Sequence, residues 1–71
     1  MPHVQISVPA GSLSPKQKAT MIEKVTDAVV EAEGIPVRPV VVVNILEVPD
    51  GGWGSGGKAV SLADLQAAYR R

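Results

Sequence analysis

The valine-rich stretch VVVVNIL, residues 40–46, does most to limit the folds open to this chain. Its β-branched side chains favour a strand, because they pack well on a pleated surface. A nearly continuous apolar run is typical of a strand covered on both faces, as in parallel sheets. The rest of the chain must therefore supply a second strand and a covering layer.

The second strand is predicted at residues 3–8, where apolar and polar side chains alternate. Val4, Ile6 and Val8 point to one side, and period-two alternation predicts a strand with one buried face. The segment PAGSL, residues 9–13, breaks the alternation and predicts a loop.

A long amphipathic helix is predicted between the two strands. Ser14 suits the N-cap, Pro15 the first helical position, and Gln17 the position that completes a capping box. Gly34 is expected to end the helix in a left-handed cap, with Pro36 preventing continuation. The helix should have about five turns, and its apolar side carries Met21, Ile22, Val25, Ala28, Val29 and Ala32.

Strand, helix and strand with short links form a βαβ unit, whose strands should be parallel and whose crossover should be right-handed. The 71 residues form a single domain, 1–71, of a size that is marginal alone. The absence of cysteine and the presence of one histidine exclude disulfides, thiolate sites and a histidine-rich metal site. One helix can cover only one face of the sheet, so we expect several copies to pack together.

The charge balance argues against several classes of partner. Seven basic and seven acidic residues give no net charge and no visible basic stripe for nucleic acid. No apolar run is long enough to span a membrane, and no signal peptide is readable. The sequence therefore predicts a cytoplasmic protein that binds neither nucleic acid nor membrane.

The glycine-rich stretch PDGGWGSGG, residues 49–57, contains the only tryptophan, Trp53. It lacks the Lys-Ser/Thr of a P-loop and the strand–loop–helix order of a dinucleotide fingerprint. Trp53 therefore either covers a subunit interface or forms an apolar wall of a small pocket. A short terminal helix is expected over residues 61–69, with Ser61 and Asp64 at capping-box spacing.

Pro2 is a candidate catalytic group at the very start of the chain. Methionine is normally removed before a small residue such as proline, which would leave Pro2 with a secondary amine. Such an amine titrates at roughly 7.7–8.0 in water, and burial in an apolar site disfavours its charged form. A neutral amine is a suitable general base. Alternatively, Pro2 merely permits removal of Met1.

Taken in order, these motifs resemble the small 4-oxalocrotonate tautomerase group of the tautomerase superfamily. The resemblance rests on the Met1-Pro2 start, the Val4-Gln5-Ile6 strand, the helix start at residues 14–18, the valine-rich strand and the WGSGG stretch at residues 53–57. It implies an α+β fold, in which a β-α-β protomer with a short C-terminal hairpin or helix assembles as a homo-oligomer, a hexamer or alternatively a trimer.

The resemblance also implies a cofactor-independent tautomerase, an isomerase that uses neither cofactor nor metal. Pro2 would be its catalytic general base for keto-enol proton transfer on a small unsaturated 2-oxo acid or a related enol. Trp53 would form part of the substrate-binding wall, in a pocket that neighbouring subunits share.

The sequence departs from the family where substrate carboxylates are bound. The family's loop arginine is matched here by Ser12 or Leu13, and its strand arginine by Val41 or Val42. A carboxylate is best bound by a bidentate guanidinium, so the absence of both arginines counts against the family's standard dicarboxylate substrate.

Arg38 is the nearest cation that could take over substrate binding. A neighbouring chain's Arg70 or Arg71 is a further candidate, and the alternative is that all three are surface charges. His3 is expected on the polar side of the first strand, outside the catalytic group.

Two other functions fit the same scaffold. A protonated Pro2 could support dehalogenation, hydration or decarboxylation of a small acid, with Glu47 or Asp50 activating water. The chain could instead be a catalytically weak subunit of a hetero-oligomer whose partner supplies the arginines.

Overall fold

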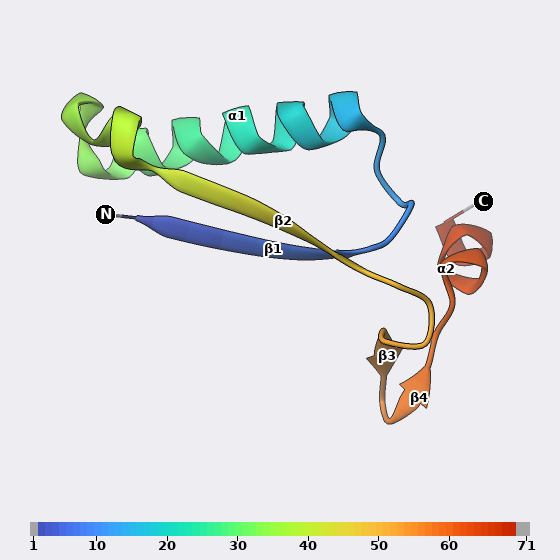
Figure 1. Cartoon of the computed structure of the whole chain (residues 1–71). Helices are drawn as coiled ribbons and strands as arrows, with labels where there is room; N and C mark the ends of the chain where they lie inside the picture. The colour runs from blue at the N-terminus through green and yellow to red at the C-terminus, as the bar shows by residue number, and fades with distance from the viewer. Residues whose placement is uncertain (1, 70–71) are drawn as a thin grey trace.

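The computed structural model describes residues 2–69 and has an elongated outline of 42 × 24 × 18 Å. A two-stranded sheet with one long helix occupies one end, and a small hairpin and a short helix occupy the other (Figure 1). The elements in order are β1 His3–Pro9, α1 Pro15–Glu33, the 3-10 helix η1 Ile35–Val40, β2 Val42–Val48, β3 Gly54–Ser55, β4 Lys58–Ala59 and α2 Leu62–Tyr69.

The predicted start of α1 is confirmed by a reciprocal capping box. The Gln17 amide donates to Ser14 Oγ at 3.1 Å, and the Ser14 amide donates to Gln17 Oε1 at 2.8 Å. The expected left-handed cap at Gly34 is wrong, because Gly34 has φ 109° and ψ 153°, a positive φ with an extended ψ. This conformation, which glycine tolerates, turns the chain directly into η1.

The two long strands are parallel, as predicted, and run in register from His3 opposite Val42 to Pro9 opposite Val48. Successive side chains of a strand point to opposite faces. One face carries the half-buried Val4 and Ile6 of β1 together with Ile45 of β2, and α1 covers it (Figure 1).

The second strand differs from its prediction at residues 40 and 41. Residues 35–40 form η1 instead, and β2 begins only at Val42. The prolines at positions 36 and 39 lie inside η1, and proline has no amide to donate to a strand ladder. The outer face of β2 is also uncovered within one chain, since Val42 and Leu46 are 41% and 44% exposed.

The buried side of α1 is rotated relative to the predicted stripe. Met21, Val25 and Val29 are half-buried, as predicted, whereas Ile22 is 39% exposed and the two alanines of the stripe, Ala28 and Ala32, are exposed. Val30, which the predicted stripe does not include, is half-buried in their place.

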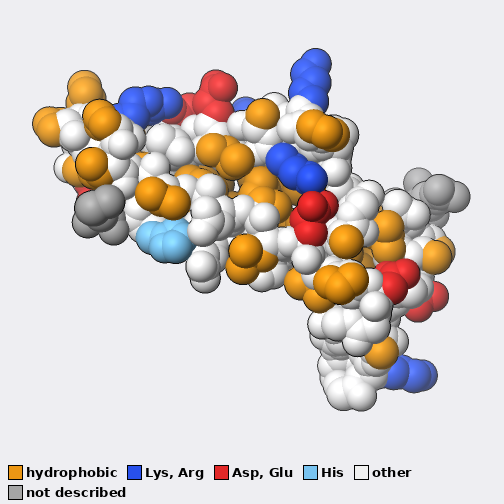
Figure 2. All heavy atoms as spheres, viewed as in Figure 1, with side chains coloured by type: hydrophobic (Ala, Val, Ile, Leu, Met, Phe, Trp, Pro, Cys, Tyr) orange, Lys and Arg blue, Asp and Glu red, His pale blue; other side chains and the backbone are white. Residues whose placement is uncertain are grey.

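The single chain has no closed core. None of the residues described is fully buried, and hydrophobic side chains are exposed along the face in Figure 2. The accessible surface is 5239 Å², whereas a compact monomer of this mass exposes roughly 4,200 Å². The radius of gyration is 14.9 Å, against about 11 Å for a compact chain of this length. About 1,000 Å² more surface is therefore exposed than in a self-sufficient domain.

Lys18 and Glu47 join α1 to the end of β2, with 3.1 Å between Nζ and Oε1. The hydrogen bond from Lys18, together with its charge, lowers the pKa of the Glu47 carboxyl below its usual value. A carboxyl whose pKa is lower in the folded than in the unfolded state adds stability above the unfolded pKa, and this stability is lost as the pH falls through the folded pKa.

We therefore expect acid to destabilise the native chain more than the Glu47→Gln variant. The difference should be small and should shrink in high salt, because the pair is exposed to solvent. Urea unfolding of both proteins at about pH 7 and about pH 3 measures it. An equal fall in the two midpoints would show that this ion pair contributes nothing to the fold.

Candidate functional site

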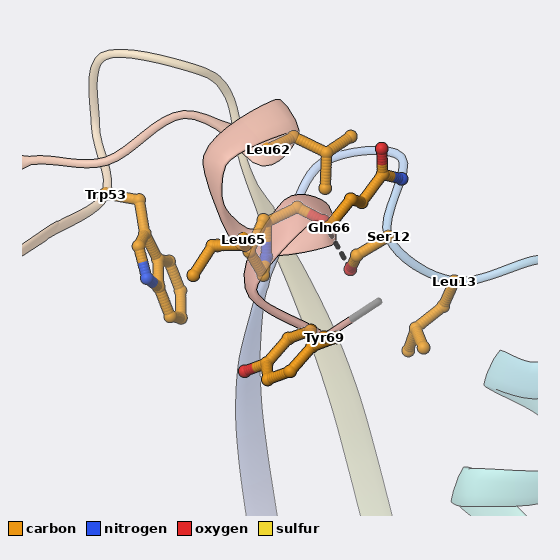
Figure 3. Close-up of a pocket in the computed structure, with 8 residues that line it drawn as sticks. Ser12, Leu13, Trp53, Leu62, Leu65, Gln66 and Tyr69 are labelled. Atoms are coloured by element: carbon orange, nitrogen blue, oxygen red, sulfur yellow. Dashed lines mark hydrogen bonds between the residues drawn. The ribbon is translucent and has the colours of Figure 1, made fainter. Parts of the chain in front are cut away.

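A cavity of about 360 Å³ lies where α2 approaches the turn after β1 (Figure 3). Trp53 forms one wall, and Leu65 of α2 lies between the indole and the rest of the cavity. No charged side chain lines the cavity within residues 2–69. Its walls are formed by Pro9, Ser12, Leu13, Trp53, Leu62, Leu65, Gln66 and Tyr69.

The position of α2 is fixed by hydrogen bonds at its N-terminus. The predicted capping box is present, with Ser61 and Asp64 bonded reciprocally at 3.1 Å in both directions. The Leu62 amide also donates to Asp50 Oδ1 at 2.8 Å. Because Asp50 follows β2, this bond ties α2 to the end of the sheet and places Leu62 and Leu65 over the cavity.

The loop that carries Trp53 is held as a small hairpin. β3 and β4 pair antiparallel, with Gly54 opposite Ala59, and the Val60 amide donates to the Trp53 carbonyl at 2.9 Å. A Cβ at Gly54 would lie 3.0 Å from the Lys58 carbonyl oxygen. Glycine at this position therefore lets the two short strands approach and hold Trp53 in place.

Gly11 allows the turn after β1 to pass close beneath α2. Its φ is 84°, and a Cβ there would lie 3.2 Å from Leu62 Cδ2. Gly57 has nearly the same φ, 83°, but a Cβ there would meet nothing within 4 Å. The two glycines thus share a backbone requirement and differ in whether a side chain would reach the cavity wall.

We expect Gly11→Ala and Gly57→Ala each to lower the free energy of unfolding by about 1 kcal/mol, because alanine is strained at positive φ. Only Gly11→Ala should displace Leu62 and change the emission of Trp53. Urea unfolding and tryptophan fluorescence measure the two effects. Identical emission spectra would show that the turn does not support the cavity.

Pro2 lies at the other end of the sheet. Its carbonyl oxygen accepts a hydrogen bond from the Val42 amide at 3.0 Å, and the residue is half-buried. The rise of a strand places Pro2 roughly 20 Å from Pro9 and the cavity, and Figure 1 shows the start of β1 and α2 at opposite ends. One chain therefore does not bring Pro2 and Trp53 together. Met1 lies outside the described residues.

Arg38, the expected substrate-binding cation, lies in η1, at the same end of the sheet as Pro2. Its Nη2 donates to Asp27 Oδ1 at 2.7 Å, and both side chains are about half exposed. Arg38 is therefore remote from Trp53 in the same chain. The other two candidate cations, Arg70 and Arg71, lie outside the described residues.

The remaining polar candidates already have partners in the structure. Glu47 pairs with Lys18, and Asp50 accepts the Leu62 amide. His3 lies on the open face of the sheet, as expected from the alternation, with its Nε2 2.9 Å from Asn44 Nδ2. None of these side chains lines the Trp53 cavity.

Sequence reasoning did not identify the residues of α2 as part of a site. Leu62, Leu65 and Tyr69 recur at i, i+3 and i+7 and so share one side of the helix. This spacing indicates from the sequence that the three side chains belong together. It does not indicate that they face Trp53, because the position of α2 depends on the hydrogen bond from the Leu62 amide to Asp50.

The comparisons with known proteins agree with the fold and the motifs. The model of the family described as "Tautomerase enzyme" matches residues 2–63. A structure from a study of the 4-oxalocrotonate tautomerase isozymes of Methylibium petroleiphilum is 44% identical over 90% of this chain and 97% of that one, with a TM-score of 0.73. TomN, a 4-oxalocrotonate tautomerase homologue of the tomaymycin biosynthetic pathway, is 30% identical over 93% of this chain and 95% of its own, with a TM-score of 0.75.

A third structure, DmpI from Helicobacter pylori, is 31% identical over 83% of this chain and 95% of that one, with a TM-score of 0.72. No protein of curated function matches the chain. Over residues 2–69, no helix is long and apolar enough to cross a membrane, and no cluster of three potential metal ligands is present. With its parallel β-α-β unit, its α+β fold and a family match over most of its length, the chain belongs to the tautomerase family.

Proposed function

We propose that this protein is a cofactor-independent tautomerase whose catalytic base is Pro2 after removal of Met1. The observation that carries the proposal is the anchored position of Pro2 at the start of β1. Its carbonyl accepts a hydrogen bond from the Val42 amide, which ties the backbone of Pro2 to the start of β2, and the match to the tautomerase family begins at this residue. A base attached to the backbone loses less freedom on binding substrate than one on a long side chain.

The proposed reaction is a proton transfer within the substrate, a small 2-oxo acid or a related enol. The neutral amine of Pro2 takes the proton from the enol oxygen, and the carbonyl double bond forms as the C=C electron pair moves toward the carbon. The protonated amine then delivers the proton to that carbon, so the substrate is isomerised with no net gain or loss of protons and the amine returns to its neutral form. An apolar environment favours the neutral amine that the first step needs.

The proposed active site is completed by a second copy of the chain. Pro2 and Trp53 are at opposite ends of one protomer, and the surface in excess of a compact monomer is about 1,000 Å², which is of the size that one partner contributes to a stable interface. The open sheet face with Val42 and Leu46 contributes part of the exposed apolar surface. We propose a homo-oligomer, a hexamer or alternatively a trimer, in which Pro2 of one copy meets Trp53 of another.

Arg38 is proposed to bind the substrate carboxylate beside Pro2, because it lies at the same end of the sheet. It would exchange its exposed partner Asp27 for the substrate, which a guanidinium can bind in bidentate fashion. The Arg38→Ala variant should then lose about tenfold or more in kcat/KM toward 2-oxo acids and little toward neutral enols.

The matched control for Arg38 is Asp27→Asn, which frees the guanidinium without removing it. This variant should retain or improve activity toward 2-oxo acids. Steady-state kinetics with both substrate types measure the effect. Equal losses on charged and neutral substrates in Arg38→Ala would remove Arg38 as a carboxylate ligand.

The proposed function is tested by intact mass and by deuterium exchange. The mature protein should lack the mass of Met1, and it should accelerate deuterium incorporation at C3 of 2-oxohexanoate in heavy water, followed by proton NMR. Retention of Met1 in the native protein, or an exchange rate no faster than buffer, would overturn the proposal. Water activation is not part of it, because Glu47 and Asp50 are engaged in the contacts described above.

A further inference from the structure

The cavity beside Trp53 differs from a carboxylate site in its chemistry. Ser12 and Leu13, one of which stands where the resemblance places the family's loop arginine, both line it. Ser12 Oγ donates its hydrogen to the Pro9 carbonyl at 2.7 Å, so this hydroxyl is not available as a donor to an anion. The remaining walls are mainly hydrocarbon, with the neutral Gln66 amide and the Tyr69 hydroxyl as further polar groups.

Much of the wall beside Trp53 comes from a part of the chain beyond the family match. That match ends at residue 63, whereas Leu65, Gln66 and Tyr69 project from the rest of α2 toward the cavity (Figure 3). Leu65 is half-buried at the centre, and Tyr69, 82% exposed, lies at the rim. α2 thus adds an apolar wall that lies mostly outside the residues matched by the family model.

We propose that α2 and Trp53 form a binding site for an uncharged, apolar end group of the substrate. The protein then prefers 2-oxo acids or enols with a hydrocarbon tail to dicarboxylates. This inference rests on the proposed function for the reacting end of the substrate, while the tail specificity rests on the cavity alone.

The physical reason is the cost of placing an ionised carboxylate in a cavity that no cation among residues 2–69 lines. A buried charge without a partner loses its hydration without compensation. A hydrocarbon tail gains free energy from leaving water in the same place. A volume of about 360 Å³ is within the usual range for small-molecule sites and is ample for a chain of a few carbons.

The matched ligands 2-oxohexanoate and 2-oxoadipate test the preference, because both are six-carbon 2-oxo acids and differ in a terminal methyl or carboxylate. Trp53 is the only tryptophan, so its fluorescence reports binding at the cavity directly. We expect 2-oxohexanoate to bind about tenfold more tightly or better. Equal or tighter binding of 2-oxoadipate, or no saturable change with 2-oxohexanoate, would overturn the inference.

A pair of α2 variants ties the preference to the cavity. Leu65→Arg puts a cation in the wall, whereas Ala67→Arg puts the same cation on the same helix at an exposed position that does not line the cavity. The first should reduce or reverse the preference for 2-oxohexanoate, and the second should leave it unchanged. The same response in both variants would indicate a general charge effect and count against the inference.

Ser12→Arg is the second variant, should Leu65→Arg fail to fold as judged by circular dichroism. It lies on the turn after β1, outside the helices, and places the cation in the same cavity. It too should shift binding toward 2-oxoadipate. An unchanged preference in a folded Ser12→Arg protein would overturn the inference.

The two proposals fail in different ways. Binding is also measured in Pro2→Ala, which lacks the proposed secondary amine but keeps the cavity. If the native protein causes no deuterium exchange but both proteins keep the binding preference, the proposed catalysis is wrong while the apolar tail site stands. If exchange is rapid but fastest with 2-oxoadipate, the tail site is wrong while the proposed catalysis stands.

Discussion

A protein whose N-terminal amine is blocked should lose nearly all of its tautomerase activity. A short uncleaved extension before Pro2 converts the secondary amine into an amide, which has no basic lone pair. General base catalysis typically contributes 10²- to 10⁴-fold in rate, so we expect kcat/KM to fall by about that factor. The measurement is the rate of deuterium incorporation at C3 of 2-oxohexanoate, compared with the protein that begins at Pro2.

Pro2→Ala is the matched variant for this experiment, because it keeps an amine but removes the rigid ring. Its loss should be smaller than that of the extended protein. In both the native and the alanine protein the rate should fall as the pH is lowered through the pKa of the amine, since a protonated amine cannot accept a proton. An extended protein with native circular dichroism, native oligomer size and full activity would contradict a role for the amine.

The parts of the fold that sequence predicts well are those fixed by neighbouring residues. The capping boxes at Ser14 and Ser61 each need only the side chain three residues further on, and both are present. The parallel pairing of β1 and β2 follows from the length of the helix between them. The first residue of β2 is harder to predict, because the valines at residues 40 and 41 favour a strand while Pro39 favours η1.

The sequence predicts which residues are candidates for the site, but it does not predict how they are arranged in space. Pro2 and Trp53 are both identified by their chemistry, yet Pro2 precedes the start of β1, whereas Trp53 lines the cavity beside Pro9, at the end of that strand. Sequence order carries no information on which copy of a chain meets which. The α2 wall was missed for a related reason, since the contact that places Leu65 runs through Asp50, twelve residues before Leu62.

Mixing two inactive variants should restore activity if each active site combines Pro2 of one copy with Trp53 of another. The N-terminally extended protein lacks the base at every site, and Trp53→Ala lacks the apolar wall at every site. In oligomers assembled at random from equal amounts of both, about one quarter of the sites receive a native Pro2 and a native Trp53. The mixed sample should therefore recover about a quarter of the native rate, well above either parent.

The control is each variant unfolded and refolded alone, which should show no gain. Native mass spectrometry, with one variant isotopically labelled, must show that mixed oligomers form. If mixed oligomers are present and activity does not rise, Pro2 and Trp53 do not meet across an interface. Because the two residues are also roughly 20 Å apart within one chain, that result would remove Trp53 from the site and leave Pro2 to act in a different pocket.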